Sequence, residues 1–95
     1  MISIRRTGHF DDWLASVKDG SARARLVVAI GKLAYGLGDI APVGEGVSEL
    51  RLHFGPGYRA YFVRRGDELI VLLCGGTKRR QSNDIAEAKR LATEI

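Results

Sequence analysis

Residues 47–75, VSELRLHFGPGYRAYFVRRGDELIVLLCG, contain three strand-like stretches separated by two glycine-containing turns. The first stretch alternates apolar and polar residues, as expected of a half-buried strand. The third is apolar without alternation, which is typical of a strand covered on both faces. Glycine at the turns lets the chain reverse direction, so these residues predict an antiparallel meander. Its strands are Val47–Phe54, Tyr58–Arg65 and Leu69–Gly75.

The residues before the meander predict one strand, two helices and a loop. Alternation makes residues 2–6 a short strand, and apolar residues at helical spacing predict two helices after it. The loop follows because four of the nine residues 38–46 are glycine or proline. Thr7 is the predicted cap of the first helix, which runs through Lys18. The helical pattern breaks at Asp19 and Gly20. Ser21 then caps the second helix, which ends at Gly36 and Gly38.

A last helix runs from a cap at Ser82 or Asn83 to the C-terminus. The sequence therefore predicts an α+β fold of order βααβββα, in which the antiparallel helical hairpin packs on the strands. A length of 95 residues fits one domain, 1–95, and we find no repeat or linker that would divide it.

Composition excludes several classes of protein. No run of 18 apolar residues exists, and the N-terminus lacks the apolar core of a signal peptide, so we expect a cytoplasmic protein without membrane contact. Cys74 is the only cysteine, and it lies in the apolar third strand of the meander, where we expect a core role. The two histidines and this cysteine show no metal-ligand spacing. We expect no structural metal and no cofactor.

The positive charge is concentrated in one segment. The net charge is +4, and residues 51–80 contain seven basic residues against two acidic ones. Such clustering is typical of a surface that binds a polyanion. It is also compatible with a hairpin that arginine keeps soluble.

Four stretches resemble the RelE/ParE superfamily, and within it the HigB-like group of addiction-module killer proteins. They are Phe10–Leu14 (FDDWL), Gly44–Arg51 (GEGVSELR), Phe54–Phe62 (FGPGYRAYF) and Leu72–Lys78 (LLCGGTK). The resemblance covers nearly the whole chain. It implies a twisted antiparallel sheet with two N-terminal helices on one face, and cleavage of messenger RNA, usually on the ribosome.

The resemblance also implies partners and site residues. The partner would be a cognate antitoxin, typically a small helix-turn-helix DNA-binding protein, and the pair would bind operator DNA through the antitoxin. Members of the superfamily place functional residues at the positions of Arg51, Arg59 and Lys78.

The same residues make chemical sense as a phosphate site. Arg51 and His53 are two apart on one predicted strand and face the same way. Arg59 follows the turn and Lys78 follows the next strand, so all four could converge at one end of the meander. Arginine binds two phosphate oxygens at once, and histidine can move a proton near neutral pH. The alternatives are an ion pair between Arg59 and Glu49, and an ordinary surface or core role for His53.

Other residues could hold the RNA strand. Tyr58 and Tyr61 could stack on bases, although strand tyrosines more often only pack. The run Lys78, Arg79, Arg80 and Gln81 could bind the RNA backbone, or it could be a solvated basic segment. Two rival functions stay open. One is a toxin of the same fold that inhibits DNA gyrase without cleaving RNA, and the other is a nucleic-acid-binding module without toxicity.

Overall fold

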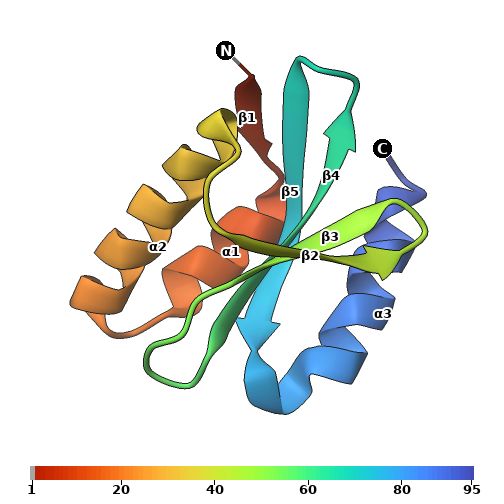
Figure 1. Ribbon diagram of the computed structural model, residues 1–95. Helices are drawn as coiled ribbons and strands as arrows, with labels where there is room; N and C mark the ends of the chain where they lie inside the picture. The colour runs from red at the N-terminus through yellow and green to blue at the C-terminus, as the bar shows by residue number, and fades with distance from the viewer. Residues whose placement is uncertain (1) are drawn as a thin grey trace.

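Three α-helices, two short 3₁₀-helices and one five-stranded sheet make up the computed structural model, which describes residues 2–95 (Figure 1). In chain order the elements are β1 (Ser3–Arg6), α1 (Gly8–Ser16), α2 (Gly20–Lys32), η1 (Leu33–Tyr35), β2 (Asp39–Gly44), β3 (Val47–Arg51), β4 (Tyr58–Arg65), β5 (Leu69–Thr77), η2 (Lys78–Arg80) and α3 (Gln81–Ala92).

The predicted meander is confirmed, but the sheet as a whole is mixed. The strand order is β1-β5-β4-β3-β2, and the neighbours β3, β4 and β5 pair antiparallel. β1 pairs with β5 in parallel, starting with Ser3 beside Leu69, so the expectation of a wholly antiparallel sheet is wrong. This pairing has a physical reason. An apolar strand such as β5 needs a neighbour on each side, and β1 supplies the second one.

The predicted loop at residues 38–46 is wrong, because Asp39–Gly44 forms β2 and pairs with β3. The observed order is therefore βααββββα rather than βααβββα. β2 lies at the edge of the sheet, where proline is tolerated because its missing N–H can face outward. The register shifts between Pro42 and Gly44, and Glu45 and Gly46 turn the chain with positive φ angles.

The helix boundaries differ from the prediction by a few residues. Thr7 caps α1 as expected, by accepting a hydrogen bond from the Phe10 N–H, but α1 ends at Ser16 and not at Lys18. Asp19, rather than Ser21, caps α2, because its carboxylate accepts from two N–H groups of the first turn. In place of a cap at Ser82 or Asn83, η2 continues directly into α3, which begins at Gln81.

The helices cover both faces of the sheet (Figure 1). α1 and α2 pack on one face with the larger apolar cluster, and α3 packs on the other face with the smaller one. β5 is buried between them from Ile70 to Cys74, which confirms the prediction for this strand. Burial raises the pKa of the Cys74 thiol to about 12, as expected of a core cysteine. Within residues 2–95, no helix combines the length and apolar content that crossing a membrane requires.

Two adjacent glycines near the end of β5 let the helices approach the sheet closely. A Cβ atom on Gly75 would lie 2.2 Å from the Trp13 ring of α1, and one on Gly76 would lie 1.8 Å from the Asp84 carboxylate of α3. No side chain fits at either distance. The glycine pair therefore determines how near α1 and α3 lie to the end of the sheet.

Replacing Gly75 with Ala should lower the free energy of unfolding by about 1–3 kcal/mol, because the rigid Trp13 ring must move. Gly31→Ala is the matched control, since nothing lies within 4 Å of the added Cβ in α2. It should raise the free energy of unfolding by about 0.5–1 kcal/mol. Urea denaturation measures both, and a Gly75→Ala midpoint equal to that of the wild type would contradict the packing argument.

Candidate functional site

The register of the sheet places charged residues in one row across neighbouring strands. Asp39 of β2 lies opposite Arg51 of β3, and Arg51 lies opposite Arg59 of β4. Residues that face each other in this way project to the same side, with Cβ atoms about 5 Å apart. That side is the one covered by α3, since Tyr61, two residues after Arg59, packs in the α3 cluster. The predicted approach of Arg59 to Arg51 is confirmed.

Lys78 lies at the same end of the sheet. Its backbone N–H donates to the Gly57 carbonyl at 2.9 Å, which fastens the start of η2 to the turn between β3 and β4. In Figure 1 the end of β5 and this turn lie at the same end of the sheet. Lys78, Arg79 and Arg80 are exposed, and none of them forms an ion pair with another residue in the range 2–95.

Asp39 joins Arg51 to His53. Its carboxylate accepts a hydrogen bond from Arg51 Nη2 at 2.8 Å, and its second oxygen lies 2.5 Å from His53 Nε2. The Arg51 hydrogen bond, and then the His53 contact, lower the pKa of Asp39. The contact therefore stabilises the fold above the ordinary pKa of an aspartate, and this contribution is lost as the pH falls through the lowered value. The His53 side chain is 70% exposed, so it can also reach a ligand.

Arg59 is buried beside Glu49. The side chains are 8% and 3% exposed, and Arg59 Nη1 lies 4.0 Å from Glu49 Oε1. Gln81 of α3 donates to the same carboxylate at 3.3 and 3.4 Å, so it points inward and not toward solvent. This is the ion pair that the sequence allowed as the alternative role for Arg59. Arg59 Nε and Nη1 have no hydrogen-bond partner among residues 2–95, which is unusual for buried donors.

The two tyrosines proposed to hold bases lie in the core. Tyr61 is fully buried, and burial and the nearby Glu49 carboxylate raise the pKa of its hydroxyl. Tyr58 is half-buried on the other face of the sheet, where its ring contacts Trp13 and Phe54 at centroid distances of 6.3 and 5.5 Å. Base stacking on Tyr61 would require α3 to move away from the sheet. The packing role fits both positions.

A second carboxylate lies under the start of α3. Asp84 sits over Gly76, and its Oδ2 is buried without a hydrogen-bond partner among the described residues. Burial raises the pKa of Asp84, and the positive charge of Arg80 opposes this effect. The charged row of Asp39, Arg51 and Arg59 is therefore enclosed by α3 at the end near Asp84 and open to solvent at the Asp39 end.

This arrangement offers cations and an imidazole ring to an anionic ligand. Arg51 and Lys78 can contact a phosphate, and His53 can exchange a proton with its ligand. Residues 2–95 include no group of three or more histidine, cysteine, aspartate or glutamate side chains that could hold a metal ion.

Asp39 is the site residue that the sequence did not reveal. Glycine and proline at residues 38–46 hid the strand that positions it. A signal was present, since Asp39, Ala41 and Val43 alternate with the more exposed Ile40 and Pro42. The enclosure of Arg59 was also not visible, because it depends on where α3 lies.

Comparison with known proteins finds a clear relative. A protein of Haemophilus influenzae (strain ATCC 51907 / DSM 11121 / KW20 / Rd), whose function is uncharacterized, is 43% identical over 95 residues. The match covers 99% of this chain and 96% of that protein. No protein-family model matches the chain.

Replacing Arg59 with Ala should lower the free energy of unfolding by about 3–5 kcal/mol, because Glu49 would stay buried without its cation. A double variant, Arg59→Met with Glu49→Leu, removes both charges and should recover most of the loss. Urea denaturation of the wild type and both variants measures this difference. Equal midpoints for the wild type and Arg59→Ala would show that the pair does not support the fold.

Proposed function

Because the chain belongs to the same family as the uncharacterized Haemophilus influenzae protein, its function has to be argued from its own residues, and we propose that it is a RelE/ParE-like toxin that cleaves messenger RNA. In this proposal the protein is the toxin of a type II toxin–antitoxin pair. It acts in the cytoplasm on messenger RNA at the ribosome, and a small helix-turn-helix antitoxin restrains it and carries the complex to operator DNA.

Two features of the fold support the RelE/ParE-like assignment. The N-terminal helices α1 and α2 lie together on one face of the sheet, as the resemblance implies. The stretches that carry the resemblance also meet in space, since Trp13 packs against Gly75 and Lys78 bonds to the turn at Gly57.

The observation that carries the proposed activity is that Arg51 and His53 share the Asp39 carboxylate, near the turn at Gly57 to which Lys78 bonds. RNA supplies its own nucleophile, because the 2′-hydroxyl can attack the adjacent phosphorus. The bond from phosphorus to the 5′-oxygen then breaks, which leaves a 2′,3′-cyclic phosphate and a 5′-hydroxyl. The protein has only to position the phosphate, move two protons and stabilise the added negative charge.

The side chains divide these tasks among them. Arg51 and Lys78 bind the phosphate oxygens and stabilise the charge that develops on them. His53 Nε2 lies 2.5 Å from the Asp39 carboxylate. In this mechanism the neutral ring carries its proton on Nε2 and donates it to Asp39, so Nδ1 keeps a lone pair and accepts the proton of the 2′-hydroxyl. Lys78 donates a proton to the leaving 5′-oxygen. Arg59 adds a fixed positive charge behind Arg51.

A specific observation also favours a second candidate function. Arg51 and Arg59 each lie beside a carboxylate, Asp39 and Glu49, and a toxin that only binds DNA gyrase would need no free cation there. Under this alternative, the row of charges holds the sheet together and toxicity comes from another surface.

Expression in a cell with and without the neighbouring small open reading frame separates these functions. A nuclease should stop growth only in the absence of the partner gene, and mapped messenger RNA ends should show new cuts in phase with codons. If growth stops without new cuts in messenger RNA and DNA gyrase is inhibited, the result favours the second candidate. If growth continues normally, the protein is not a toxin, and the result favours a nucleic-acid-binding module.

Arg51→Ala and Lys78→Ala should each lower the rate of RNA cleavage by about 10²- to 10³-fold, because each removes a cation from the transition state. Arg64→Ala is the matched control, since Arg64 is an exposed arginine of β4 at the far end of the strand. It should leave the rate unchanged. Cleavage of messenger RNA on ribosomes by the purified protein measures these rates, and wild-type rates in both variants would contradict the proposed mechanism.

Asp39→Asn should lower kcat with little change in KM, because the amide still fills the position but no longer accepts hydrogen bonds from both neighbours. Asp39→Glu should restore part of the loss. ¹⁵N NMR of the histidine rings gives an independent readout, with His9 as the internal control. The His53 ring should change its tautomer in Asp39→Asn, and an unchanged His53 spectrum would rule out the positioning role of Asp39.

A further inference from the structure

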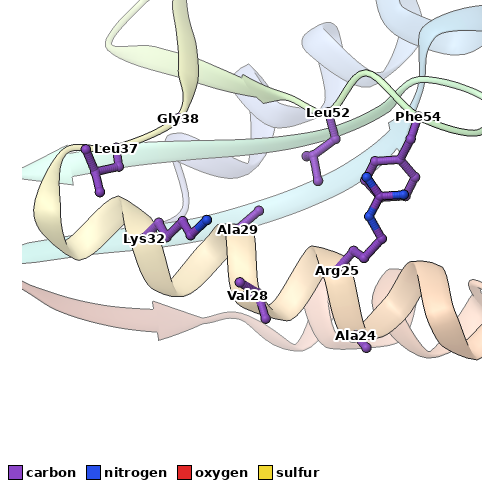
Figure 2. Close-up of a pocket in the computed structure, with 9 residues that line it drawn as sticks. All are labelled: Ala24, Arg25, Val28, Ala29, Lys32, Leu37, Gly38, Leu52 and Phe54. Carbon is purple, nitrogen blue, oxygen red and sulfur yellow. The ribbon is translucent and has the colours of Figure 1, made fainter.

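A groove on the other side of the molecule is not used by the proposed mechanism. It lies between α2 and two other segments, one directly before β2 and one directly after β3. Its volume is about 500 Å³ (Figure 2). Val28, Ala29 and Lys32 of α2 lie along one wall, Leu52 and Phe54 lie along the opposite wall, and Leu37 and Gly38 close one end. The groove opens on the α2 face of the sheet, whereas the charged row faces α3.

The groove belongs to an exposed apolar surface. Six large apolar side chains among residues 2–95 are exposed, and five of them lie between residues 27 and 40: Val27, Val28, Tyr35, Leu37 and Ile40. Within the groove, Val28 is 59% exposed and Leu37 is 55% exposed. Exposed apolar side chains in a groove on a small domain commonly mark a binding site.

The charges around the groove are all positive. Arg25 stacks on Phe54, with its guanidinium carbon 3.6 Å from the ring centroid, and Lys32 lies two turns further along α2. None of the nine lining residues is acidic, and neither Arg25 nor Lys32 forms an ion pair within residues 2–95. A guanidinium stacked on a ring keeps its N–H groups available for a carboxylate.

We propose that this groove binds an acidic amphipathic helix of a partner protein. The apolar stripe of the partner helix would lie on Val28, Leu37 and Leu52, and carboxylates beside the stripe would pair with Arg25 and Lys32. The size fits, because α2 has 13 residues and is about 20 Å long, so a helix of three to four turns can lie along it. A second copy of this chain is a poor occupant, since it would bring one cationic groove against another.

The inference goes beyond the proposed nuclease activity and does not depend on it. If this inference and the nuclease proposal are both correct, the partner would bind the toxin on the face opposite the charged row. A partner bound there could leave Arg51 and Lys78 exposed, so binding and inhibition would be separate properties of the complex.

The test uses the full chain and a designed helical peptide with leucines at positions i, i+4 and i+7 and glutamates on both flanks. ¹H–¹⁵N NMR should show saturable binding, with shifts concentrated at the groove residues. A peptide with lysine in place of every glutamate has the same apolar stripe and should bind at least about tenfold more weakly, because it repels Arg25 and Lys32.

Val28→Asp should weaken binding of the acidic peptide by about tenfold or more, because it places a carboxylate in the apolar wall of the groove and beside the glutamates of the peptide. Val27→Asp is the matched control, since Val27 is the preceding exposed valine of α2 but does not line the groove, and it should leave the affinity unchanged. Both variants should keep the RNA cleavage rate of the wild type, so failure of this inference can be told apart from failure of the nuclease proposal. Equal binding of the two peptides, loss of affinity in Val27→Asp alone, or shifts confined to β2 or η2 would overturn it.

Discussion

The missing side chains at Gly75 and Gly76 are the constraint on which the rest of this structure depends. They let the Trp13 ring approach the sheet from one face and the Asp84 carboxylate approach it from the other. Asp84 lies in the first turn of α3, and α3 encloses the inner part of the charged row. With a bulkier residue at Gly76, α3 would lie further out, and the boundary between buried and exposed charges would shift.

The consequence is a graded electrostatic environment along one row of the sheet. At the α3 end of the row, Arg59 is buried together with Glu49, which lies two residues before Arg51 on β3, so each needs the other to offset the cost of leaving water. At the Asp39 end, Arg51 and His53 share a carboxylate but remain partly exposed. A substrate anion can compete with a carboxylate at the exposed end, where water already weakens the ion pair, far more easily than at the buried end.

The sequence predicted those elements whose signal is local. Alternation in Val47–Arg51 and the unbroken apolar run of β5 identified the meander, and Thr7 marked the start of α1. β2 was missed because Pro42 and Gly44 are poor strand formers, and only its pairing with β3 makes it a strand. Strand register correctly placed Arg51 beside Arg59. The burial of Arg59 could not be read from spacing, since it results from a helix more than twenty residues away.

The parallel pairing of β1 with β5 has a consequence for the order in which the molecule forms. Ser3 and Leu69 are neighbours in space, although they are 66 positions apart in a chain of 95 residues. Closing so long a loop carries an entropic cost that is recovered only when β5 is present to receive the first strand. A growing chain can therefore form the α1–α2 hairpin early, but its first strand must wait for β5. A truncated product would lack the finished sheet and, with it, any property that depends on the assembled row.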